Sequence, residues 1–122
     1  MKNINEFITE KLAKVNASSL KNFDWRCKHI SKEDFFKFAL AACKEAKVYP
    51  SDVIEEISQF EDPDELERQW EAGHLNYYIK WEDALIEKIA NDDKYSGKEG
   101  DIADYAFGDA YEIFNKLLQF MN

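Results

Sequence analysis

Apolar residues along the chain recur every three to four positions, the spacing that places them on one face of an α-helix. The first stripe consists of Ile4, Phe7, Ile8, Leu12 and Val15, and it predicts a helix that ends near Asn16. A second stripe of Leu20, Phe23, Cys27 and Ile30 predicts another helix. Strand signals are nearly absent, because the chain holds one threonine and three valines. The pattern therefore predicts an all-α fold.

Capping residues and helix breakers mark the later boundaries. Ser31, with Asp34 three positions on, predicts the start of a third helix. Its apolar face consists of Phe35, Phe38, Ala39, Ala42, Cys43 and Ala46. Pro50 interrupts the pattern, because the residue before a proline avoids helical geometry, and Ser51 is placed to cap a new helix. The apolar face of that short helix consists of Val53, Ile54, Ile57 and Phe60.

The strongest boundary in the chain is Asp62 followed by Pro63, a cap residue and a proline at the first helical position, with Glu65 three residues after the cap. The helix that follows is expected to stop at Gly73. The next apolar stripe consists of Leu75, Tyr78, Ile79, Leu85, Ile86 and Ile89. It gives way to a polar loop over residues 91–100.

The last helix is expected to begin at Asp101 and to carry a broad apolar face from Ile102 to Met121. Six or seven helices with short connections must run mostly antiparallel to their neighbours in sequence. The expected architecture is a compact bundle or a short stack of antiparallel helical hairpins. A chain of 122 residues lies in the usual range for one domain, so residues 1–122 are expected to form a single helical domain.

Composition indicates a cellular setting. The chain is 45% hydrophobic and 15% aromatic, which is too apolar for a disordered protein. Its longest apolar run, residues 38–43, is far shorter than the roughly 20 residues of a membrane span, and Lys2 and Glu6 oppose a signal peptide. Cys27 and Cys43 lie among apolar neighbours and are expected to be free buried thiols, with a single buried disulfide as the alternative. A cytoplasmic location is therefore expected.

Charge is distributed unevenly along the chain. Residues 1–50 hold ten Lys or Arg against six Asp or Glu, whereas residues 51–122 hold six against nineteen. Residues 51–72 alone contain nine acids and one base, Arg68. Like charges three or four positions apart on a helix repel by about 0.2–0.5 kcal/mol per pair, so this clustering costs the monomer stability. Solubility is one explanation, and a binding surface for a basic partner is the other.

The acids of this segment fall into two groups. Asp52, Asp64 and Glu65 lie in the first turns of predicted helices, where a carboxylate interacts favourably with the helix dipole. The others have no such local role, and the same half of the chain holds five of the six tyrosines and two of the three tryptophans, the residue types that anchor interfaces. The candidate partner-binding residues are Glu55, Glu56, Glu61, Glu67, Trp70, Glu71, Tyr77, Trp81 and Glu82.

Tyr77 and Trp81 lie four positions apart, on a different face from the core stripe of their predicted helix. Either a second neighbouring helix buries these two side chains or a partner does, because a helix between two layers is apolar on two faces. The sequence favours burial by a neighbour for these two rings.

Catalytic and metal-binding motifs are weak. Glu71 and His74 have the spacing of a di-iron element, but Gly73 interrupts the helix between them and no second such element exists. Residues 92–103 lack oxygen ligands that a calcium loop needs, and the cysteines and histidines match no compact zinc motif. A DNA-binding role for the basic first half is opposed by the isoelectric point near 4.7. No catalytic residue, cofactor or metal is predicted, and a non-enzymatic protein is expected.

In size, acidity, aromatic content and helical pattern, the chain resembles the small acidic immunity proteins of bacterial nuclease-toxin systems, including those of contact-dependent growth inhibition. The resemblance implies an inhibitor that covers the substrate-binding surface of a basic toxin nuclease, without direct contact to nucleic acid or membrane. The chain also resembles acidic phage inhibitors that imitate nucleic acid and block restriction or CRISPR enzymes. A helical metal protein or enzyme that uses Glu71 and His74 is a third alternative.

Overall fold

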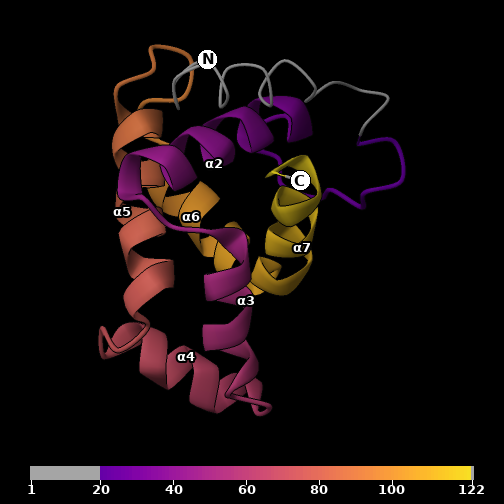
Figure 1. Ribbon diagram of the computed structural model, residues 1–122. Helices are drawn as coiled ribbons and strands as arrows, with labels where there is room; N and C mark the ends of the chain where they lie inside the picture. The colour runs from indigo at the N-terminus through magenta and orange to yellow at the C-terminus, as the bar shows by residue number, and fades with distance from the viewer. Residues whose placement is uncertain (1–19, 122) are drawn as a thin grey trace.

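The computed structural model describes residues 20–121, which form a helical bundle (Figure 1). Its helices are α2 (Lys32–Ala46), α3 (Pro50–Ser58), α4 (Pro63–Glu71), α5 (Asn76–Ala90), α6 (Glu99–Gly108) and α7 (Ala110–Met121). No strand occurs within residues 20–121, so the all-α prediction is confirmed. The helix predicted up to Asn16 lies outside the described residues. Among the helices of the described range, none has the length and apolar character to cross a membrane.

Two predicted helix starts are confirmed with their capping contacts. The Ser31 hydroxyl accepts a hydrogen bond from the Asp34 amide at 3.2 Å, and α2 begins at the next residue. The Asp62 carboxylate accepts from the Asp64 amide at 2.9 Å, which fixes the start of α4. Gly73 follows α4 with φ of 79°, a left-handed conformation that a side chain disfavours, so the predicted stop is confirmed as well.

The helix predicted over Leu20 to Ile30 is wrong, because these residues form turns and irregular chain. Side-chain N–H groups donate there to backbone carbonyl groups that would accept from backbone amides in a helix. The Trp25 indole donates to the Ile30 carbonyl at 3.0 Å, and the Lys32 ammonium donates to the Leu20 and Phe23 carbonyls at 2.7 and 3.0 Å. Leu20 and Ile30 are nevertheless buried. The apolar pattern therefore predicted the burial of these side chains correctly, but not the backbone conformation of the segment.

Two further boundaries differ from prediction. The last helix is divided into α6 and α7, which meet at Asp109, and α6 begins at Glu99, so Asp101 lies in its first turn and does not cap it. Ser51 lies inside α3, which begins at Pro50. Proline has no backbone N–H and suits the first helical position, so the helix starts at Pro50, two residues earlier than a cap at Ser51 would give.

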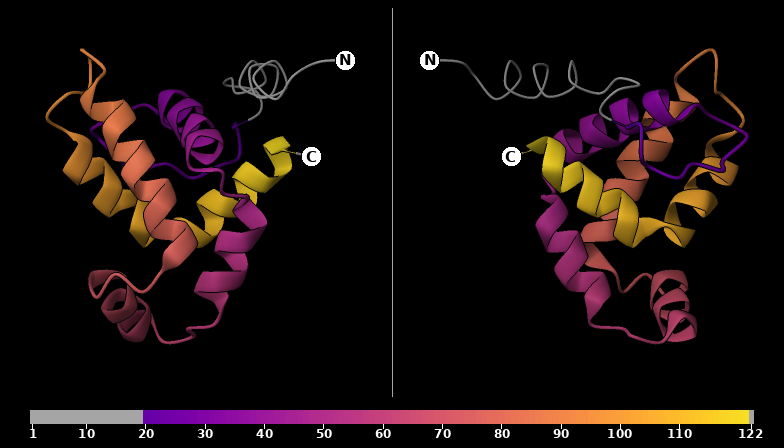
Figure 2. Two further views of the ribbon diagram at one scale, coloured as in Figure 1. Left: turned by 60° about the vertical axis from the view of Figure 1, so that its left-hand side comes forward. Right: turned by 90° about the vertical axis from the view of Figure 1, so that its right-hand side faces the viewer.

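The core forms where α2 packs across α5 and where α3 packs against α7, with α6 alongside α5 (Figure 2). The largest fully buried side chains are Trp81, Tyr78, Phe35, Phe36 and Phe114. Edge-to-face aromatic pairs join α2, α5 and α7 in this core, including Trp81 with Phe114 at 4.6 Å between ring centroids. In contrast, α4 contributes no buried residue and lies at the end of the molecule away from α2 (Figure 1).

The loop between α5 and α6 is fixed to the start of α2. The Tyr95 hydroxyl donates to the Asp34 carboxylate, and the Lys94 ammonium lies 3.5 Å from the same carboxylate. The Tyr95 ring also packs edge-to-face on Phe38. The hydrogen bond from Tyr95, assisted by Lys94, lowers the pKa of Asp34.

Candidate partner-binding end

The segment from Pro50 to Ala72, which comprises α3, α4 and the chain between and after them, is called the acidic end below. Its exposed carboxylates are Glu55, Glu61, Asp62, Asp64, Glu67 and Glu71. Within residues 20–121 the ion pair found in this segment joins Arg68 to Glu65, and no lysine of residues 20–49 pairs with an acid of the segment. The negative charge of the acidic end is therefore not compensated by the described part of the chain's basic half.

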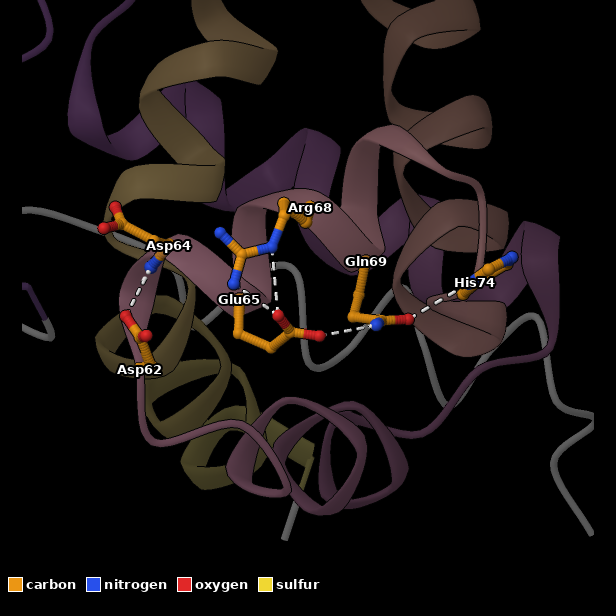
Figure 3. A network of polar contacts seen from close by, with 6 residues as sticks. All are labelled: Asp62, Asp64, Glu65, Arg68, Gln69 and His74. Atoms are coloured by element: carbon orange, nitrogen blue, oxygen red, sulfur yellow. Dashed lines mark hydrogen bonds and ion pairs between the residues drawn. The ribbon is translucent and has the colours of Figure 1, made fainter.

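A polar network along α4 involves Glu65 (Figure 3). Its Oε2 accepts two hydrogen bonds from Arg68, at 3.0 Å from Nε and 2.5 Å from Nη2, and its Oε1 accepts from Gln69 at 2.8 Å. The Gln69 amide oxygen lies 3.0 Å from His74 Nδ1, beyond the end of the helix. The contacts from Gln69 and Arg68 lower the pKa of Glu65. Both carboxylate oxygens of Glu65 are therefore hydrogen-bonded within α4. The negative charge that is available to a partner is carried by the other exposed acids of the segment.

Glu56 has a structural role that the sequence analysis missed. Its two carboxylate oxygens accept hydrogen bonds from the backbone amides of Tyr77 and Tyr78, at 3.1 and 2.9 Å. These amides lie in the first turn of α5, where amides have no partner inside the helix, and Leu75 at the cap position offers no side-chain oxygen. Glu56 therefore caps α5 from α3, and its assignment as a free partner-binding acid is corrected.

Trp81 and Glu82 do not lie on the surface, so their assignment as partner-binding residues is wrong. The Trp81 ring is 0% exposed, and its indole donates to the Ala39 carbonyl of α2 at 3.0 Å. Glu82 is 8% exposed and lies beneath α4. The physical reason is that neighbouring helices cover these two side chains of α5. Trp81 lies under α2, and Glu82 lies under α4. The burial that the sequence favoured for Trp81 is confirmed, whereas Tyr77 remains 40% exposed.

Trp70 links α4 to the rest of the molecule. Its ring stacks on Phe107 of α6, with centroids 3.9 Å apart and planes inclined by 12°, and its Nε1 donates to Glu82 Oε1 at 3.2 Å. The residue is half-buried, and Leu66 packs beside the core one turn earlier. Trp70 therefore holds α4 in place. Only the exposed part of its side chain is accessible to a partner.

Glu82 has unusual surroundings for a carboxylate. Burial raises its pKa, and the nearby charges of Asp83 and Asp104 raise it further, while the hydrogen bond from Trp70 and the nearby Tyr78 hydroxyl act in the opposite direction. Its Oε2 and the hydroxyl of fully buried Tyr78 are both without a hydrogen-bond partner within residues 20–121. Two neighbouring buried polar groups are thus left unsatisfied under α4.

No group of three or more His, Cys, Asp and Glu side chains suited to a metal ion occurs within residues 20–121. Both cysteines are free, and burial raises the pKa of Cys43 to about 12, which keeps its thiol protonated and unreactive. An open groove with a volume of about 610 Å³ lies beside Tyr111 and Lys116 of α7.

Four of the predicted acids, Glu55, Glu61, Glu67 and Glu71, therefore remain exposed at the acidic end, with Tyr77 partly exposed near the start of α5. Asp62 and Asp64 join them, although the sequence analysis had assigned Asp64 a purely local role. The nine-acid segment was the signal that could have found both. No protein-family model, no curated protein and no solved structure matches this chain.

Proposed function

We propose that this chain is a non-enzymatic inhibitor of a basic partner protein, in the manner of an immunity protein that covers the substrate-binding surface of a toxin nuclease. The observation that carries this proposal is the uncompensated charge of the acidic end, where exposed carboxylates lie on α3, on α4 and in the short connection between these helices. A surface that binds nucleic acid is positively charged, so it attracts a compact negative surface and rejects neutral or positive ones.

The architecture of α4 supports this role. None of its nine residues is fully buried, and Leu66 and Trp70 pack against the core while only partly buried. Asp64, Glu67 and Glu71 lie three or four positions apart, and like charges at this spacing repel by about 0.2–0.5 kcal/mol per pair. Helix α4 thus adds repulsion between like charges and little core packing. This is explained if its charges interact with another molecule.

The geometry also favours a protein partner over imitation of nucleic acid. An inhibitor that imitates a duplex needs acids spaced along an extended face at phosphate-like intervals. Here the exposed acids lie on two helices of nine residues, each about 14 Å long at 1.5 Å per residue, and in the short connection between the helices. A compact patch of this size matches a patch on a folded partner better than it matches a groove for a long polymer.

The test uses the protein encoded by the gene next to this one, purified and assayed for nuclease activity with and without the present protein. We expect inhibition by the wild-type chain. The triple variant Glu61→Gln, Glu67→Gln and Glu71→Gln should slow association by about tenfold or more at low salt, because electrostatic steering depends on these charges. Stopped-flow fluorescence measures the rate.

A matched control removes three exposed acids elsewhere, through Glu87→Gln, Asp93→Asn and Glu112→Gln. These three side chains form no hydrogen bond or ion pair within residues 20–121, and the change in net charge is the same. We expect the control to slow association by less than about twofold. Equal effects of the two triple variants would show that the acidic end is not the interface, and an uninhibited neighbour would contradict toxin immunity.

A further inference from the structure

The attachment of α4 to the bundle depends on few contacts. Trp70 stacks on Phe107 and donates to Glu82, and Leu66 adds a partly buried contact. The helix is connected at both ends by short non-helical chain, which on one side includes Gly73 in a left-handed conformation. Such an element can separate from the bundle without opening the core formed by α2, α5 and α7.

The groups around the Glu82 carboxyl group, beneath Trp70, disfavour its ionised form. The titratable groups that face Glu82 are Tyr78 and Asp83 from α5 and Asp104 from α6, while α4 contributes the neutral indole of Trp70. Two of these neighbours repel a carboxylate, and no cation pairs with Glu82 within residues 20–121. Its Oε2 and the Tyr78 hydroxyl lack partners although both are buried.

We propose that docking of α4 onto the bundle is coupled to uptake of a proton by Glu82, so that α4 is held firmly at mildly acidic pH and loosens as the pH rises. A neutral carboxyl group loses less hydration energy on burial than a carboxylate does. One hydrogen bond can join Oε2 to the Tyr78 hydroxyl in either protonation state, with the carboxyl O–H or the tyrosine O–H as the donor, so the preference for the protonated form comes from the smaller loss of hydration on burial. The proton comes from solvent, and no other bond changes.

The direction of the coupling follows from the direction of the pKa shift. Docking raises the pKa of Glu82 above its ordinary value of 4.5, so the docked form binds the proton more tightly than the undocked form, in which water reaches the carboxylate. By linkage, protonation favours docking by the same factor. This coupling belongs to the free protein, and it holds whether or not the acidic end binds a partner.

The experiment follows the full-length ¹⁵N-labelled protein by NMR from about pH 4 to about pH 8. The Trp70 indole resonance is identified by its loss in Trp70→Phe. We expect this resonance and the α4 amides to shift along one titration curve with a midpoint above 4.5, the ordinary Glu value. The heteronuclear NOE of the α4 amides should fall on the alkaline side as the helix loosens.

Glu82→Gln supplies the neutral side chain permanently, so its α4 should stay docked and lose the titration across this range. Glu87→Gln, on an exposed position of the same helix, should leave the titration unchanged. Asp104→Asn removes a repelling charge and should lower the midpoint. The proposal is overturned if the wild-type α4 resonances do not titrate, if Glu82→Gln retains the curve, or if Asp104→Asn leaves the midpoint unchanged or raises it.

Discussion

At the scale of single residues, the tryptophans show how one side-chain type serves different purposes. Trp81 is fully buried where α5 crosses α2, and its indole hydrogen bond satisfies the Ala39 carbonyl. Trp70 instead lies half-buried between α4 and α6, where it joins the charged helix α4 to the core. Trp25 stays half-buried and donates to Ile30, which holds the irregular segment before α2. Only the surroundings distinguish these roles.

Substitution of Trp81 should therefore affect stability. We expect Trp81→Phe to lower the free energy of unfolding by about 2–3 kcal/mol, because it removes the indole hydrogen bond to the Ala39 carbonyl and leaves a cavity beside Phe114. Urea denaturation followed by circular dichroism measures the change. Tyr77→Phe, at an exposed ring, should change the free energy by less than about 0.5 kcal/mol. A Trp81→Phe protein as stable as wild type would contradict the packing described.

At the scale of the helices, two kinds of start occur. The starts of α2 and α4 are capped by the residue immediately before the helix, Ser31 or Asp62. The start of α5 is capped from a distance, because Glu56 of α3 reaches the amides of Tyr77 and Tyr78. The contact fixes the spacing between α3 and α5 and thereby the position of the acidic end.

Removal of this distant cap has a defined expected cost. Glu56→Ala should lower the free energy of unfolding by about 1 kcal/mol, the usual effect of losing a capping side chain. Glu55→Ala is the matched control, since it removes the same charge from the same helix at an exposed position and gains the same helix propensity. Chemical denaturation of the two variants checks the difference. Equal stability of the two would argue against the cap.

At the scale of the whole molecule, contacts between distant parts of the chain hold the fold together. The Tyr95 hydroxyl donates to Asp34, which joins the loop after α5 to the start of α2. The lowered pKa of Asp34 means that the folded state holds its carboxylate more tightly ionised than the unfolded chain does. This contribution is present above the ordinary value of 3.8 and is lost as the pH falls through the lowered pKa.

Tyr95→Phe tests that connection. The variant keeps the ring that packs on Phe38 and loses the hydrogen bond that contributes most to the lowered pKa of Asp34. We expect it to be less stable than wild type by about 1 kcal/mol at neutral pH. The difference should shrink in acid, where Asp34 is protonated in both proteins. Thermal unfolding at a series of pH values measures it, and a difference that grows in acid would reverse the assigned sign.

Local signals in the sequence were sufficient to predict the starts of α2 and α4 and the end of α4. Ser31, Asp62 and Gly73 act on residues within one turn, so their roles could be recognised without knowledge of the fold. The helix predicted over Leu20 to Ile30 failed because burial has the same apolar signature in irregular chain, where the side chains of Trp25 and Lys32 replace helical hydrogen bonds.

The candidate site could be predicted only in part, for a physical reason. Exposure of Glu61, Glu67 and Glu71 follows from charge, because unpaired carboxylates avoid burial. The fates of Glu56 and Glu82 depend on partners 21 and 12 positions away, and no local spacing encodes such contacts. Predictions from charge are therefore correct for solvent-exposed acids. They fail for acids that form hydrogen bonds to distant parts of the fold.

The unequal charge of residues 20–49 and of the acidic end gives the molecule a permanent electric moment. Residues 20–49 carry seven Lys or Arg and four Asp or Glu, while the acidic end at the opposite pole holds nine acids and one base. A nearby cationic surface exerts a torque on such a body and turns its negative pole forward before contact. Orientation would then precede collision, and a larger share of encounters would begin in the productive pose.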